Sequence, residues 1–206
     1  MRILSCSLLI AAAAAGYAAD STGVTRLAVK MVSPDYDMDI GGLYDFEGEW
    51  DDAYMIEATI LGTLETYGLW SATSGVGIVY GSYNEQHIED DGGEVDMEGL
   101  GLRWFIGPSM GSGAFRCEVL PVLGIGWYNL TLGGNNTDPM WELGGIANAT
   151  FAFGGGWEFG VNGGATYREA KFRNWYVDTP TGRINDINVK FSQLAIEYGA
   201  SIGYRF

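Results

Sequence analysis

Long segments of this chain alternate strictly between apolar and polar residues. At its end, LAIEYGASIGYRF, an apolar side chain stands at every second position from Leu194 to Phe206. Successive side chains of a β-strand point to opposite faces, so a period of two predicts strands with one apolar and one polar face. Glycine accounts for 32 of the 206 residues, a load that would weaken helices. The sequence therefore predicts an all-β protein.

Turn residues divide the chain into eight alternating segments, and the spacers between them are alternately short and long. A transmembrane barrel has tight turns at one rim and longer loops at the other. We therefore expect an eight-stranded antiparallel up-and-down transmembrane β-barrel, with the long loops outside and both termini in the periplasm. The expected strands are 24–33, 53–65, 69–83, 94–107, 114–130, 142–153, 156–170 and 188–206. The short spacers are 66–68, 107–113 and 154–155, and the long ones are 34–52, 84–93, 131–141 and 171–187.

The stretch GGLYDFEGEW, residues 41–50, complicates the strand count. It has the alternation of a ninth strand, and an even number would then require a tenth. We place it in the first external loop, as a ribbon above the membrane. A ten-stranded barrel is the alternative.

The polar face distinguishes a membrane barrel from a soluble one. It combines glycine with sparse charges of both signs, whereas the outer face of a soluble barrel carries polar side chains at nearly every position. The interior of eight strands is filled by side chains, and unpaired charges there would be costly. We expect a paired lumen network, little conductance and a structural role. Because glycines would widen the lumen, the alternative is a narrow porin-like channel or small-ligand carrier. The predicted network comprises Lys30, Glu57, Arg103, Arg116, Glu118, Glu158 and Glu197.

The first residues have the pattern of a secretory signal peptide. Arg2 is followed by an apolar run from Ile3 to Ala15, and small residues precede a predicted cut after Ala18. We therefore expect a signal peptide at 1–18 and a barrel domain at 19–206. The mature chain would carry ten basic and 26 acidic residues, a net charge of −16, which argues against nucleic-acid binding. Beyond the signal, no run of 18 apolar residues predicts a transmembrane helix.

The last strand carries the most specific motif, an aromatic-rich apolar face that ends on the final residue. Tyr198, Ile202, Tyr204 and Phe206 share this face. In this respect the chain resembles the small outer-membrane β-barrels of Gram-negative bacteria, the OmpA/OmpX-like group. The resemblance implies that the barrel-assembly machinery reads this strand. It also implies a monomer that contacts outer-membrane lipid and lipopolysaccharide, without a cofactor.

The first long spacer, 34–52, holds eight acids and no base. Its DYDMD stretch is similar to the start of a calcium loop, but the glycine comes one place late and Phe46 stands at the glutamate position, which excludes an EF-hand. Asp35, Asp37 and Asp39 remain candidates to bind divalent cations that bridge lipopolysaccharide phosphates. The alternative is a solvated acidic loop that keeps the rim soluble. We predict a structural or surface-interaction role through these loops.

A lipid-modifying barrel enzyme is a further alternative, because some barrels of this size carry a His and a Ser near the rim. His87 is the one histidine, and Glu89, Asp90 and Asp91 could orient its imidazole. Ser82 is the closest serine, and no nucleophile stands beside His87 in sequence. We therefore expect a solvated loop histidine and no enzymatic activity.

Overall fold

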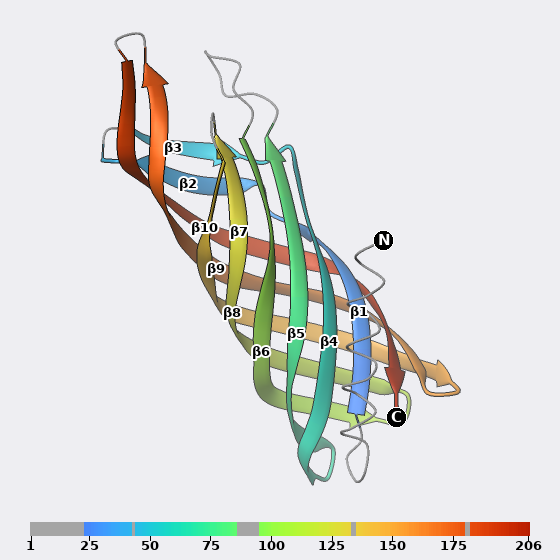
Figure 1. Cartoon of the computed structure of the whole chain (residues 1–206). Helices are drawn as coiled ribbons and strands as arrows, with labels where there is room; N and C mark the ends of the chain where they lie inside the picture. Colours follow the sequence, from blue (N-terminus) through green and yellow to red (C-terminus); the bar gives the residue numbers. More distant parts are fainter. Residues whose placement is uncertain (1–22, 43, 86–94, 133–134, 180–181) are drawn as a thin grey trace.

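The computed structural model describes residues 23–42, 44–85, 95–132, 135–179 and 182–206. These residues form ten antiparallel strands (Figure 1). No helix in these ranges is long and apolar enough to cross a membrane. The strands are β1 (Gly23–Val32), β2 (Asp35–Ile40), β3 (Tyr44–Glu49), β4 (Asp52–Tyr67), β5 (Trp70–Glu85), β6 (Val95–Ser112), β7 (Phe115–Leu132), β8 (Asn135–Gly154), β9 (Trp157–Thr179) and β10 (Gly182–Arg205).

Eight of these strands close into a barrel. β1 pairs with β4, each strand from β4 to β10 pairs with the next, and β10 returns to pair with β1. At one end of this seam, Gly23 and Phe206 exchange two backbone hydrogen bonds of 3.1 and 3.0 Å. Closure gives every wall strand two neighbours, which a sheet in lipid requires. The eight-stranded antiparallel prediction is confirmed, and the ten-stranded ring is not formed.

The other two strands form the ribbon expected in the first long spacer. β2 and β3 pair from Asp35–Glu49 to Ile40–Tyr44. β2 also pairs with β10, from Ile40–Val189 to Asp37–Ser192, beyond the point where β1 ends at Val32. The hairpin therefore extends the wall at the end of the barrel opposite the C-terminus (Figure 1).

The opposite rim consists of three two-residue turns. They lie between β4 and β5, β6 and β7, and β8 and β9. Gly68 and Gly113 have φ angles of 67° and 61°, in the left-handed region that glycine enters without steric cost. The short spacers thus lie at one rim, on the side of the C-terminus (Figure 1).

Several strands are longer than expected at the other rim. β8 begins at Asn135, β9 continues to Thr179 and β10 begins at Gly182, so most of the expected loops 131–141 and 171–187 is strand. At the short-turn rim, most of the expected turn 107–113 is likewise strand, because β6 continues to Ser112. The period of two persists in these polar stretches: Phe172 points inward between the outward Lys171 and Arg173. The hydrogen-bonded ladder therefore continues beyond the apolar part of the wall.

Candidate functional site

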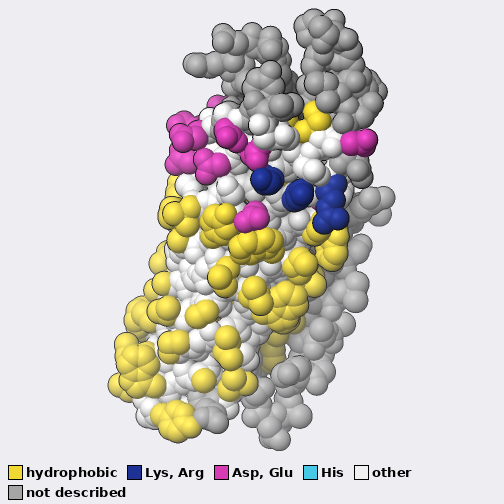
Figure 2. Space-filling model, turned by 90° about the vertical axis from the view of Figure 1, so that its left-hand side faces the viewer, with side chains coloured by type: hydrophobic (Ala, Val, Ile, Leu, Met, Phe, Trp, Pro, Cys, Tyr) yellow, Lys and Arg dark blue, Asp and Glu magenta, His cyan; other side chains and the backbone are white. Residues whose placement is uncertain are grey.

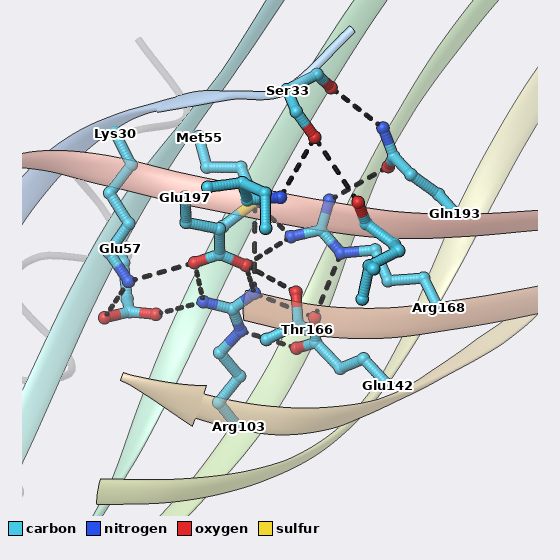
Figure 3. Close-up of polar contacts among 12 residues, drawn as sticks. Lys30, Ser33, Met55, Glu57, Arg103, Glu142, Thr166, Arg168, Gln193 and Glu197 are labelled. Carbon is cyan, nitrogen blue, oxygen red and sulfur yellow. Dashed lines mark hydrogen bonds and ion pairs between the residues drawn. The ribbon is translucent and has the colours of Figure 1, made fainter. Parts of the chain in front are cut away.

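The lumen contains a central ion-pair cluster built around Arg103 of β6. Its guanidinium reaches three carboxylates: Nη1 lies 2.7 Å from Glu57 Oε2, Nη2 2.6 Å from Glu197 Oε1, and Nε 2.5 Å from Glu142 Oε1 (Figure 3). All six side chains of the cluster are buried. Three cations face three carboxylates, so the cluster is neutral. Its members are Lys30, Glu57, Arg103, Glu142, Arg168 and Glu197.

Glu197 of β10 connects the members of this cluster. Its carboxylate accepts hydrogen bonds from Arg168 Nη2 at 2.6 Å and Thr166 Oγ1 at 2.7 Å, and it lies 3.4 Å from Lys30 Nζ. The second terminal nitrogen of Arg168, Nη1, donates a hydrogen bond to the Tyr83 hydroxyl at 2.6 Å. The cluster therefore ties together strands that are distant in sequence and carries no spare charge.

A lower ion-pair cluster lies nearer the short-turn rim. Arg26 pairs with Glu118, and its Nε lies 2.6 Å from Glu158 Oε1. Arg116 Nε lies 2.9 Å from Glu118 Oε1, and Arg205 Nε lies 2.5 Å from Glu158 Oε2. Three cations share two carboxylates here. The lower cluster carries one excess positive charge and lies closer to solvent, since the Arg205 side chain is 29% exposed.

Apolar side chains fill the lumen space around these clusters. Leu61, Phe105 and Leu120, together with Arg26 and Glu57, line a cavity of about 20 Å³ between the two clusters. That volume holds about one water molecule. A loop-side apolar cluster fills the other end of the lumen; it includes Tyr36, Met38, Trp50, Met55, Tyr83, Met97, Tyr128, Leu130, Phe172, Val189 and Phe191.

All seven charges of the predicted network point into the lumen, in two groups rather than one. Lys30, Glu57, Arg103 and Glu197 belong to the central cluster, and the other three to the lower one. The prediction omitted four charges that complete the clusters, although each has the inward parity of its strand. It also omitted the apolar interior. The omitted charges are Arg26, Glu142, Arg168 and Arg205.

The outer wall reverses the usual arrangement of a soluble protein. Large apolar side chains point outward from every wall strand, for example Val29 at 55%, Leu123 at 56% and Leu194 at 63% exposure, while charged groups fill the interior. Figure 2 shows this hydrophobic surface, with acidic and basic side chains gathered above it. An apolar exterior around a closed ring suits lipid rather than water. The fold is that of a small outer-membrane β-barrel.

Comparison with known proteins supports this outer-membrane fold. The OprG outer membrane protein of Pseudomonas aeruginosa matches with a TM-score of 0.53 and 13% identity, over 90% of this chain and 96% of that one. The outer membrane protease OmpT of Escherichia coli matches with a TM-score of 0.50 and 9% identity, over 90% and 97% of the two chains. No family model and no curated protein matches the sequence. The likeness to Gram-negative barrels concerns the fold alone.

The four residues of the C-terminal motif lie on the lipid-facing side of β10. Their side chains are exposed outward, and the Tyr204 ring contacts Trp157 edge-on, with the ring centroids 5.4 Å apart. Recognition of this strand by the barrel-assembly machinery stays a prediction. The four residues are Tyr198, Ile202, Tyr204 and Phe206.

The candidate cation ligands of the barrel lie on the outer face of the β2–β3 hairpin. Asp35, Asp37 and Asp39 stand directly opposite Glu49, Glu47 and Asp45, so every second rung of the hairpin is a pair of acids. We call these six residues the acidic ladder. The described residues contain no group of three or more His, Cys, Asp or Glu side chains arranged to hold a metal ion.

Asp39 is the member of the acidic ladder with defined partners. It accepts a hydrogen bond from the Gly42 amide at 2.7 Å, and its Oδ2 lies 3.1 Å from Lys190 Nζ. The Gly42 amide, followed by Lys190, lowers the pKa of the Asp39 carboxyl below its usual value. Asp39 therefore fixes the turn of the hairpin and links it to β10.

Other predicted features fall outside the described part of the barrel. His87, Glu89, Asp90 and Asp91 are among these residues, as is the whole of the expected signal peptide, 1–18. Ser82, the nearest serine in sequence, is buried in β5. The enzyme alternative therefore gains no catalytic geometry from the described residues.

Proposed function

We propose that this protein is a non-conducting outer-membrane barrel with a structural role, which presents the acidic ladder at the cell surface for interaction with other molecules. The filled lumen is the observation that carries the proposal. In this arrangement the long-loop rim faces outward and both termini face the periplasm.

The packing of the lumen argues against a conducting path. A permeating ion would have to separate Arg103 from three carboxylates that lie within 2.7 Å of its nitrogens. Separating buried charges leaves each uncompensated, which is strongly unfavourable. The loop-side apolar cluster closes the same path with buried aromatic and methionine side chains. A small-ligand carrier that uses the lumen is also disfavoured, since the lumen cavity of about 20 Å³ admits no more than a water molecule.

The acidic ladder supports a surface-interaction role. Like charges directly opposite each other in a sheet are destabilising, and here three alternate rungs, all on one face, carry such pairs. Asp39 holds the turn of the hairpin, but packing gives no reason for the other carboxylates, because the inward Tyr36 and Met38 supply the buried contacts. A surface with this charge attracts cationic partners and repels acidic ones.

Single-channel recording in planar bilayers tests the non-conducting role. Purified protein should insert without conductance steps, whereas a general porin reconstituted in the same way should conduct. A shift in gel mobility between boiled and unboiled samples would verify that the inserted protein is folded. Steady conductance steps from the folded wild type would overturn the proposal in favour of the channel.

Binding of a lysine-rich peptide to the detergent-solubilised protein tests the surface role. The triple variant Asp37→Asn, Asp45→Asn, Glu47→Gln should bind at least tenfold more weakly than the wild type. The triple variant Asp52→Asn, Asp96→Asn, Glu98→Gln, which removes three outward acids from β4 and β6 instead, serves as the matched control. Equal affinity of the triple variant and the wild type would refute a role for the ladder.

A further inference from the structure

The cations of this acidic protein are distributed unevenly between the two sides of the wall. The sequence has 11 Lys and Arg residues, and six of those that the structure describes belong to the two lumen clusters. Among the cations whose side chains the structure describes, those that point outward are Lys171 and Arg173 of β9 and Lys190 of β10. These three form one group, which we call the basic patch.

The register of the strands brings the three residues of the patch together on one face of β9 and β10. Lys171 stands directly opposite Lys190, and Arg173 follows two residues further along the same face of β9. Two like charges on one rung repel each other, so this arrangement is unfavourable without a counterion. Lys190 pairs with Asp39 on its far side, whereas Lys171 and Arg173 make no side-chain ion pair with any carboxylate in the described ranges.

The patch lies immediately above the lipid-facing surface. Figure 2 shows the basic group bordering the hydrophobic surface, beside the acidic group. On β8 and β9, the rings of Trp141 and Tyr167 lie 5.6 Å apart, and such aromatic pairs mark the membrane–water interface. Lys171 follows Tyr167 by four residues, about 13 Å along a strand, or about 10 Å along the membrane normal for a tilt near 40°.

The backbone at Lys171 therefore lies just above the lipid headgroups. The headgroup layer is roughly 5–7 Å thick on each side of the hydrocarbon core, and long basic side chains can extend down to it. Glu169 lies two residues from Lys171 on the same face of β9 and forms no ion pair with it; its carboxylate accepts a hydrogen bond from the Tyr167 hydroxyl at 3.3 Å. Lys171 and Arg173 thus remain available to an anion that approaches from the membrane.

We propose that Lys171, Arg173 and Lys190 bind the phosphate groups of an anionic glycolipid in the outer leaflet. Lys and Arg donate charge-assisted hydrogen bonds to phosphate oxygens, and Arg can do so through two nitrogens at once. A phosphate between Lys171 and Lys190 neutralises their mutual repulsion. The glycolipid would then lie against the outer face of β9 and β10, beside the acidic ladder and not on it.

Thermal unfolding of the whole protein in zwitterionic detergent tests the proposal. EDTA is present throughout, so that divalent cations cannot bridge phosphate to the acidic ladder. Bisphosphorylated lipid A should raise the unfolding midpoint of the wild type, read from the gel-mobility shift on heating. The variant Lys171→Gln/Lys190→Gln should need at least tenfold more lipid A for the same rise, while Lys171→Arg/Lys190→Arg should behave as the wild type.

Two comparisons distinguish the sources of phosphate. Inorganic phosphate at the same phosphate concentration should leave the midpoint unchanged, and an equal rise would overturn the lipid assignment. Native mass spectrometry should count fewer lipid A molecules on the glutamine variant than on the arginine variant. If the glutamine variant responds to lipid A as the wild type does, the patch faces water or a protein partner and the proposal is wrong.

Discussion

Replacing Arg103 by methionine removes the cation at the centre of the lumen. The central cluster would then hold Glu57, Glu142 and Glu197 against Lys30 and Arg168, a change from neutral to one uncompensated negative charge. Methionine fills much of the same volume, so the effect comes from charge and hydrogen bonding rather than from a cavity.

The size of the effect follows from the burial of the pairs. Arg103 is fully buried and forms ion pairs with three carboxylates. Breaking a buried pair by removing one partner costs about 3–5 kcal/mol, whereas an exposed pair contributes at most about 1 kcal/mol. Glu197→Gln leaves one excess positive charge and should cost a similar amount. The double variant Arg103→Met/Glu197→Gln restores neutrality and should lose about 2–3 kcal/mol less than the sum of the two single variants.

Urea unfolding in detergent micelles, followed by tryptophan fluorescence, measures these free energies. Lys190→Met, which breaks the exposed pair with Asp39, is the control and should lose no more than about 1 kcal/mol. Losses below about 1 kcal/mol for both lumen variants, or strict additivity in the double variant, would show that the cluster does not act as a buried neutral unit.

Three further predictions concern the seam and the hairpin. Gly199→Ala should lower the unfolding free energy by about 1–3 kcal/mol, because the added methyl group would overlap the Val29 carbonyl across the β1–β10 seam. Urea unfolding measures this loss. An unchanged free energy would mean that the seam adapts to the methyl group. Deleting Phe206 should reduce the heat-modifiable fraction in outer-membrane preparations, because its backbone closes the seam with Gly23, while Phe206→Tyr should assemble normally. Because folding lowers the pKa of Asp39, its stabilising contribution is complete above the pKa of the unfolded chain, about 4. The contribution is lost as the pH falls through the lower pKa of the folded protein. Exchange of the Gly42 amide should accelerate over that range in the wild type, and a wild type as insensitive to pH as Asp39→Asn would contradict this assignment.

The sequence predicted the ring and the facing of its side chains because a period of two assigns each residue to one face. Lys30, Glu57 and Glu197 were placed in the lumen on this ground alone. The same rule puts Arg168 on the polar face as well, although the predicted network left it out, and it would have placed Glu142 there had it been applied to every inward position. Phe105 and Leu120 also have the inward parity, but they were missed because the inward face was expected to be polar.

Two features were beyond the reach of the sequence. The division of the lumen charges into two clusters depends on the stagger between strands, which brings Glu197 of β10 against Arg103 of β6, 94 residues away. The ends of the strands at the long-loop rim were also missed. Around Lys171 and Arg173 the outer face lies above the apolar band of the wall, so a strand and a loop there have the same polar composition.

The closed ring leaves no wall strand with a free side, but β3 stands at the end of the described strand order. An unpaired strand of this kind can recruit the same strand of a second molecule. Every second residue of β3, from Asp45 through Glu47 to Glu49, is an acid that points outward. Two copies meeting edge to edge would bring these carboxylates together, so the two β3 strands would repel each other. The acids of the ladder therefore oppose pairing of two copies through the exposed edge of β3.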